Sequence, residues 1–271
     1  MLNSGDKSIS KTIQEKLDEI EQTHNVRILY AAESGSRAWG FASPDSDYDI
    51  RFIFVHPATA YLGITPLDDS INIMDGDLDF SGWDIRKTFA LLQNGNVAAL
   101  EWLASPTVYQ ECEPSLKNSA NALYRPEGAL GHYYGLARKT YEIQLRNQEW
   151  WNIKKTLYVL RGLFCCMWVE ANAEIRLPPL DFITLARSVC GEDIMATVIR
   201  LLEVKTGEDE SWVINKKDLD HLERFILDRL DHNLKIIRMQ PGADRLICQE
   251  KIDQQRPAVD RFVAAVILGE A

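Results

Sequence analysis

The hydrophobic and polar positions follow two different periods along the chain, and the change comes near residue 84. Before it, residues 26–34 and 48–55 are apolar runs rich in β-branched and aromatic side chains, which predict strands. Residues 70–83 consist of two alternating runs joined around Asp75-Gly76, a turn dipeptide that tolerates positive φ. A β-hairpin is therefore predicted there, and this part of the chain is expected to form a small sheet.

A helix is predicted ahead of these strands, because Ile13, Leu17 and Ile20 recur at spacings of four and three within residues 9–22. From residue 84 onward the helical period dominates. It marks residues 83–93, 96–105, 132–146, 153–171, 193–207 and 218–238.

The polar stretch 124–131 is the predicted domain boundary. The predicted fold class is α+β, with a small sheet domain and flanking helices over residues 1–125, followed by an all-α helical-bundle domain over residues 126–271.

Composition and charge narrow the choice of partners. The 271 residues are 46% hydrophobic, enough to bury a core, and carry 30 Lys and Arg against 40 Asp and Glu. The net charge of −10 provides no overall field to attract a polyanion, which disfavours non-sequence-specific nucleic-acid binding but leaves room for a local basic groove. We also expect no recognition of a DNA sequence. The five cysteines show no zinc-ligand spacing, and neither a signal core nor a long apolar run is present. We therefore expect a cytoplasmic protein without a membrane partner.

Two aspartates stand where the second predicted strand begins. Asp47 and Asp49 are two residues apart, so their side chains are predicted to project from one face of the strand. Carboxylates held so close repel each other unless a cation lies between them. Their hard oxygen donors suit Mg²⁺, with Mn²⁺ as a further candidate, because these ions also accept phosphate oxygens and waters as ligands.

A Gly-Ser turn lies ten residues ahead of this pair. Gly35 permits close approach of the backbone to a phosphate, and Ser36 adds a hydroxyl donor, so the turn is predicted to hold phosphates. A two-ion site also needs a third carboxylate from a neighbouring strand. The hairpin offers Asp79, which we favour, and Asp77 as the alternative. Asp84 is predicted instead to cap the next helix.

These residues carry a family resemblance. The stretch "GSRAWGFASPDSDYDIRFIF" resembles the Gly-Ser and Asp-x-Asp signature of the DNA polymerase β-like nucleotidyltransferase superfamily. Together with "SGWDIRKTFALLQNGNVAALEWLASP" it is similar to the YcgL-like predicted nucleotidyltransferases associated with RNA repair, most strongly over residues 31–106. The resemblance implies a mixed sheet with helices and a helical domain across the nucleotide cleft.

The resemblance also implies a reaction. Asp47, Asp49 and Asp79 would bind two Mg²⁺ ions, and Gly35 and Ser36 would hold the triphosphate. A nucleoside monophosphate would pass from a nucleoside triphosphate to an acceptor, with release of pyrophosphate. The acceptor stays open between an RNA end, a protein and a small molecule.

Further cations could complete the nucleotide site. Arg37 follows the phosphate turn, where it could contact phosphate or support the turn. Lys87 could contact phosphate or the acceptor, or it could lie on a solvated helix face. Lys154, Tyr158 and Arg161 fall on one face of the helix over residues 153–171, at spacings of four and three. This basic and aromatic stripe is predicted either to close the cleft over the nucleotide or to form hydrogen bonds inside the bundle.

Two other functions use the same residues. A metal-dependent phosphohydrolase would call for a His or Lys base close to the aspartate pair, which the sequence does not provide. A regulatory or antitoxin-like module that binds nucleotide without turnover would not need all three carboxylate positions. A metal-dependent nucleotidyltransferase is therefore the leading hypothesis.

Overall fold

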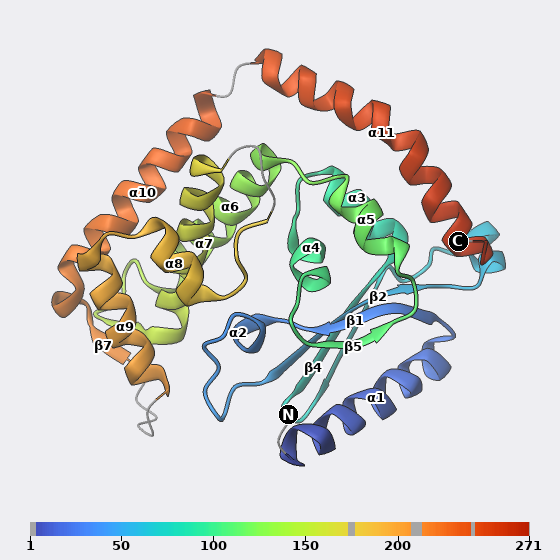
Figure 1. Ribbon diagram of the computed structural model, residues 1–271, viewed down its shortest axis with the longest axis horizontal. Helices are drawn as coiled ribbons and strands as arrows, with labels where there is room; N and C mark the ends of the chain where they lie inside the picture. Colours follow the sequence, from blue (N-terminus) through green and yellow to red (C-terminus); the bar gives the residue numbers. More distant parts are fainter. Residues whose placement is uncertain (1–3, 173–176, 207–212, 240–241, 271) are drawn as a thin grey trace.

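A mixed sheet lies at the centre of the N-terminal part of the protein (Figure 1). The structure, a computed structural model, describes residues 4–172, 177–206, 213–239 and 242–270. Within these ranges the sheet has five strands in the order β3-β4-β2-β1-β5. The strands are β1 Arg27–Glu33, β2 Tyr48–Val55, β3 Ser70–Asp75, β4 Leu78–Asp84 and β5 Val108–Glu111.

Strands β2 and β4 run parallel, whereas the other neighbouring strands pair antiparallel. The β3–β4 hairpin sets the direction of β4, and the parallel register then places Asp49 opposite Asp79 and Phe54 opposite Asp84. Two acidic residues that are 30 positions apart in sequence therefore lie at the same level of adjacent strands.

Helices cover both faces of the sheet. Helix α1, Ser4–His24, buries Ile13, Leu17 and Ile20 against one face, where Phe52 and Phe80 are fully buried. Helices α3, α4 and α5 lie on the opposite side of the sheet from α1 (Figure 1). They comprise Ile85–Gln93, Ala98–Leu103 and Ser115–Asn121, respectively. Of these, α3 and α4 contact the strands directly. We call residues 4–121 the sheet half.

The helical half, residues 126–239, is organised around α7, Ile153–Ala171. Leu157, Leu160 and Leu163 on this helix are fully buried, and α7 contacts every other long helix of the half. Those helices are α6 Pro126–Gln144, α8 Phe182–Val189, α9 Glu192–Thr206 and α10 Asp220–Met239. Two short strands, β6 Trp150–Asn152 and β7 Val213–Asn215, pair antiparallel beside them.

Side-chain caps fix where several helices begin. The side chains of Asp84, Asn152 and Asp181 accept hydrogen bonds from the free backbone amides at the starts of α3, α7 and α8. Each cap satisfies a donor that the helix itself cannot pair. The predicted role of Asp84 as a helix cap is confirmed.

A buried polar contact joins the two halves. Glu101 of α4 accepts hydrogen bonds from Arg161 of α7 and Tyr133 of α6, both at 2.9 Å. The Arg161 guanidinium also lies 4.1 Å from the ring centroid of Trp39, which follows α2, Gly35–Ala38. One hydrophobic core runs through both halves around these groups.

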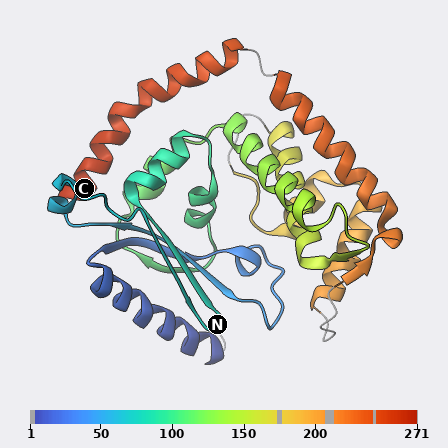
Figure 2. The ribbon, with the colours of Figure 1, turned by 180° about the vertical axis from the view of Figure 1, so that it is seen from behind.

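The last helix returns to the sheet half. Helix α11, Gly242–Leu268, runs from the end of α10 towards α3, as both ribbon views show (Figures 1 and 2). Phe262 contacts Phe89 of α3 with ring centroids 5.5 Å apart. Arg27 of β1 donates a hydrogen bond to the Val266 carbonyl at 3.2 Å. Helix α11 therefore packs on the sheet half although it follows the helical bundle in sequence.

The predicted α+β fold class is confirmed, and the strands β1 to β4 and the helices α1, α3, α4, α6, α7, α9 and α10 occur where the periodicity placed them. The division at residue 125 stays a prediction, although α6 does begin at Pro126. Position 207, the predicted end of one helix, and the ends of the predicted domain ranges at 1 and 271 lie outside the described residues. No helix among the described residues is long and apolar enough to span a membrane.

The hydrophobic periodicity did not predict several of the observed elements. Strand β5 and helices α5 and α8 are short, so they contain too few periodic positions to stand out. Helix α11 contains Pro257, and its apolar residues do not gather on one face. These elements are stabilised by tertiary contacts more than by their own pattern.

Gly82 in the middle of β4 provides a test of the sheet packing. A Cβ at Gly82 would lie 2.1 Å from the ring of Phe52, which is fully buried on the neighbouring strand. We predict that Gly82→Ala lowers the free energy of unfolding by at least about 2 kcal/mol, because neither the ring nor the backbone has room to move. Urea denaturation would measure the change.

Gly131→Ala is the matched control. Gly131 lies within α6, where an added Cβ would meet no atom within 4 Å. We expect this substitution to raise the free energy of unfolding by roughly 0.5 kcal/mol through reduced backbone entropy of the unfolded chain. Equal effects of the two substitutions would contradict the packing of Phe52 over Gly82.

Candidate active site

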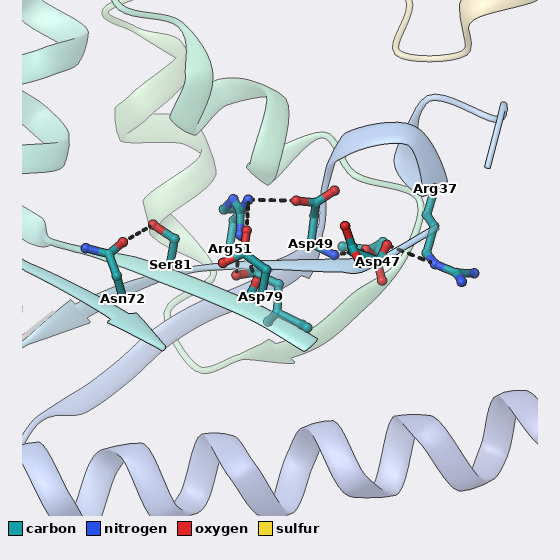
Figure 3. A network of polar contacts seen from close by, with 9 residues as sticks. Arg37, Asp47, Asp49, Arg51, Asn72, Asp79 and Ser81 are labelled. Carbon is teal, nitrogen blue, oxygen red and sulfur yellow. Dashed lines mark hydrogen bonds and ion pairs between the residues drawn. The ribbon is translucent and has the colours of Figure 1, made fainter. Parts of the chain in front are cut away.

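Two strands bring Asp49 and Asp79 together, and Arg51 joins them. The Arg51 Nη2 atom lies 2.7 Å from Asp49 Oδ1 and 2.8 Å from Asp79 Oδ2. Its Nη1 atom donates hydrogen bonds to the backbone carbonyls of Asp79 at 2.8 Å and Ile50 at 3.2 Å. Figure 3 shows the guanidinium between the two carboxylates. All three side chains stay partly accessible, so the cluster is open to solvent.

Asp47 lies in the turn just before β2, and Arg37 supports this turn. Arg37 donates hydrogen bonds to the carbonyls of Ser46 at 2.7 Å and Asp47 at 3.2 Å, and its guanidinium stacks 3.6 Å from the Tyr48 ring centroid. In Figure 3 the Asp47 side chain lies beside Asp49, while Arg37 points away from the carboxylates. Arg37 thus supports the turn, one of the two roles expected from sequence.

The Gly35-Ser36 turn lies directly against the Asp49 carboxylate. Gly35 has a φ of +60°, and a Cβ at this position would lie 2.0 Å from Asp49 Oδ2. The Ser34 amide donates a hydrogen bond to the Asp49 carbonyl at 2.8 Å, which fixes the turn to β2. Both the backbone conformation and the lack of space therefore require glycine at position 35.

A buried glutamate stands behind Asp49. Glu33, at the end of β1, is 3% exposed and accepts a hydrogen bond from the Asp49 amide at 2.8 Å. The Tyr109 hydroxyl of β5 donates to its other oxygen. Burial raises the pKa of the Glu33 carboxyl, while these hydrogen bonds act in the opposite direction. Glu33 thus ties three strands together where the site begins.

The charge balance at Asp49 favours additional positive charge. Burial raises the pKa of the Asp49 carboxyl above its ordinary value, and Arg51 opposes this rise more strongly than any other group. The neighbouring carboxylates of Asp79 and Asp47 raise the pKa further, whereas Lys154 lowers it. A raised carboxyl pKa means that the ionised form is disfavoured in the metal-free site. A cation bound nearby would relieve that cost.

Lys154 and Tyr158 of helix α7 interact electrostatically with the carboxylates. The charge of Lys154 acts on Asp49, and the charges of Asp49 and Asp47 act on Tyr158. Burial first, and then these two carboxylates, raise the pKa of Tyr158 to about 12, so its hydroxyl stays protonated. Its ring packs edge-on against Trp39, with centroids 5.2 Å apart.

Arg161, the third residue of the stripe, lies deeper. It is 4% exposed, pairs with Glu101 and covers Trp39. The stripe is therefore divided: Lys154 and Tyr158 interact electrostatically with the carboxylates, whereas Arg161 has a structural role between the halves.

The remaining candidates lie elsewhere. Lys87 pairs with Asp69 at 2.8 Å and lines a cavity of about 990 Å³ between α3, α11 and the loop after β2. This cavity lies at the end of β4 marked by Asp84, about 16 Å along the strand from Asp79 at the usual rise per residue. Asp77 is exposed in the hairpin turn, where its carbonyl accepts a hydrogen bond from Tyr48. Neither residue joins the carboxylates around Arg51.

The donor set at the site fits a hard divalent cation. Asp47, Asp49 and Asp79 offer carboxylate oxygens, the donors that Mg²⁺ and Mn²⁺ prefer. Asp49 Oδ2, the oxygen that Arg51 does not contact, lies directly against the Gly35 backbone. Among the described residues, no group of three or more His, Cys, Asp or Glu side chains is already arranged around one metal position.

Several of these residues were not predicted from the sequence. Arg51 could have been recognised from the sequence, because it follows Asp49 at the strand period of two and therefore lies on the same face of the strand. Glu33 and Glu101 have only weak signals as charged residues at the edges of apolar segments. Their partners, Tyr109 and Arg161, lie 76 and 60 positions away in sequence, so local patterns could not reveal the contacts.

Known proteins similar to this chain cover most of its length. The family RlaP, described as an RNA repair pathway DNA polymerase beta family, matches residues 9–255. An uncharacterized protein, YcgL of Bacillus subtilis (strain 168), is 39% identical over 248 residues, which are 90% of this chain and 91% of the relative. A nucleotidyltransferase-like protein from Exiguobacterium sibiricum 255-15, known from a crystal structure, is 12% identical with a TM-score of 0.30. That comparison covers 82% of this chain and 74% of the other.

The family match and the close relative both extend across the sheet half, the carboxylates and the helical bundle. The resemblance recognised in the motifs around Gly35 and Asp49 is thereby confirmed, and this chain belongs to the RNA repair pathway DNA polymerase beta family.

Proposed function

We propose that the protein is a metal-dependent nucleotidyltransferase that moves a nucleoside monophosphate from a nucleoside triphosphate to a hydroxyl acceptor. Its family membership supports a nucleotidyltransferase. The observation that carries the proposal is the pairing of Asp49 with Asp79 across parallel strands, directly beside the Gly35-Ser36 turn. Metal-binding carboxylates beside a turn that can hold phosphate are requirements of phosphoryl transfer.

Each residue has a distinct role in this proposal. Asp47, Asp49 and Asp79 hold the divalent cations, with Mg²⁺ as the first candidate and Mn²⁺ as the second. When bound, such ions neutralise the charge that develops on the phosphoryl oxygens. The turn at Gly35 and Ser36 holds the triphosphate, Lys154 adds a positive charge, and Tyr158 borders the base or ribose.

The bond changes follow from this arrangement. The acceptor oxygen bonds to the α-phosphorus, the bond from that phosphorus to the β-phosphate oxygen breaks, and pyrophosphate leaves. The proton of the acceptor hydroxyl leaves to a carboxylate of the site. We propose an RNA end as the first acceptor to test, because the description of the family names an RNA repair pathway.

A labelling screen tests the proposal. Each of the four nucleoside triphosphates, labelled at the α-phosphate, would be incubated with the protein, Mg²⁺ and either total RNA, protein or small hydroxyl compounds. Transfer of label to one acceptor class, with pyrophosphate release, supports the proposal. Release of phosphate or monophosphate without labelled acceptor would indicate a phosphohydrolase instead.

Substitution of the proposed metal ligands should lower the transfer rate strongly in this assay. We predict that Asp49→Asn and Asp79→Asn each lower the transfer rate at least about a hundredfold, because each removes an anionic metal ligand. Pyrophosphate release under saturating nucleotide would measure the rate.

Two neighbouring aspartates serve as matched controls. Asp45→Asn and Asp77→Asn change exposed acids in the same two turns and should retain transfer within about twofold. If Asp77→Asn abolished transfer while Asp79→Asn did not, the third ligand would be Asp77.

The position of Gly35 predicts an effect on nucleotide binding. Gly35→Ala would place a methyl group 2.0 Å from Asp49 Oδ2 in a strained backbone conformation. We expect the dissociation constant of a nonhydrolysable triphosphate to rise at least about tenfold in calorimetry. Unchanged nucleotide affinity would remove Gly35 from the phosphate site.

Lys154 should act on the nucleotide rather than on folding. Removal of the charge by Lys154→Met should weaken triphosphate binding about tenfold or more through loss of a charged contact. The free energy of unfolding should change by no more than about 0.5 kcal/mol. The control Lys235→Met removes an exposed lysine of α10 and should leave binding unchanged. A stability loss in Lys154→Met with normal nucleotide affinity would give Lys154 a structural role instead.

A further inference from the structure

Arg51 occupies the space that separates the two paired carboxylates. A single nitrogen, Nη2, contacts one oxygen of Asp49 and one of Asp79, at 2.7 and 2.8 Å. Without this cation, two carboxylates on adjacent strands at the same level would repel each other. Arg51 therefore provides the charge compensation that the folded site needs before any metal ion arrives (Figure 3).

The guanidinium has a second set of partners that does not involve the carboxylates. Nη1 donates to the carbonyls of Asp79 and Ile50, which belong to the sheet backbone. The side chain is 18% exposed, so it has solvent on one side. It can lose its carboxylate contacts and still retain hydrogen-bond partners.

A divalent cation would compete with this arrangement. Metal ligation by Asp49 and Asp79 places a second, doubly charged cation against the same two carboxylates, close to the fixed positive charge of Arg51. Like charges at this separation repel strongly in a partly desolvated site.

We propose that Arg51 is a built-in counter-ion of the metal site, which holds Asp49 and Asp79 in the metal-free protein and releases them when a divalent cation binds. The inference rests on the proposed metal site and adds a residue that sets its affinity. Arg51 lowers the affinity for free metal in the resting protein, so that stable loading depends on the extra negative charge of a triphosphate. It is a positioning residue, because it acts through the carboxylates.

Metal binding to the nucleotide-free protein tests this role without any activity measurement. Calorimetry with Mn²⁺ would compare the wild type with Arg51→Gln, which removes the charge, and Arg51→Lys, which keeps the charge without the planar fork. We expect Arg51→Gln to bind Mn²⁺ at least about tenfold more tightly than the wild type, and Arg51→Lys to lie between them. Equal or weaker binding by Arg51→Gln would overturn the proposal.

Thermal unfolding gives a second readout. In the presence of a chelator, Arg51→Gln should melt below the wild type because Asp49 and Asp79 then face each other uncompensated. Saturating Mn²⁺ should restore most of the difference. A variant that melts like the wild type without metal would contradict the counter-ion role.

Arg229→Gln is the matched control. Arg229 of α10 has similar exposure and pairs with Glu170 at 2.7 Å, outside the carboxylate site. Its loss should lower the melting temperature while Mn²⁺ affinity stays unchanged. A comparable gain in Mn²⁺ affinity in Arg229→Gln would show a general charge effect and overturn the specific role of Arg51.

The wild-type protein offers a test that does not depend on a folded variant. The side-chain NH signals of Arg51, observed by NMR of ¹⁵N-arginine-labelled protein, should shift and exchange faster with solvent when diamagnetic Mg²⁺ saturates the site. Signals unchanged at saturation would show that Arg51 keeps its carboxylate contacts and would overturn the proposal.

These outcomes separate the two proposals. If the wild type binds Mn²⁺ and Asp49→Asn does not, the metal site stands, and the Arg51 comparison decides the counter-ion role alone. If neither the wild type nor Arg51→Gln binds Mn²⁺, the metal site and the counter-ion role both fail.

Discussion

The repulsion between carboxylates on neighbouring strands is the constraint on which the site depends. The parallel register of β2 and β4 places Asp49 and Asp79 at the same level, and burial makes the charge on Asp49 costly. The metal-free protein compensates with Arg51, which lies on the same strand face and reaches both acids. The Arg51 guanidinium also donates hydrogen bonds to backbone carbonyls of both strands, so the group that compensates the charge also stabilises the sheet.

The packing around Asp49 converts this charge cluster into a defined site. Glu33 holds the Asp49 amide, the Ser34 amide holds its carbonyl, and the Gly35 backbone packs against one carboxylate oxygen. The backbone of β2 is thus fixed on both sides of the side chain. A ligand position held by such contacts loses little conformational entropy when a cation or phosphate binds.

The interface between the halves contains a buried ion pair. Glu101 pairs with Arg161 in a buried contact, and Trp39 lies beneath the same guanidinium. Removing one partner of a buried ion pair leaves an uncompensated charge, which is strongly destabilising. Lys154 and Tyr158 lie seven and three residues before Arg161 on α7, and both interact electrostatically with the carboxylates.

The sequence by itself determined the local parts of this protein. Strand period and turn residues located β1, β2 and the β3–β4 hairpin, helical period located the long helices other than α11, and the Gly35 to Asp49 motif indicated the family. These features depend on neighbours within a few residues, which is why a pattern can report them.

Only the tertiary structure decided which candidates meet. Strand register brought Asp79 rather than Asp77 to Arg51, and helix packing separated Arg161 from Lys154 and left Lys87 at the far end of β4. It also turned Arg37 towards the carbonyls of the Ser46 and Asp47 turn. Each of these outcomes depends on the partner that a side chain finds across the fold, and hydrophobic periodicity along one segment contains no information about that partner.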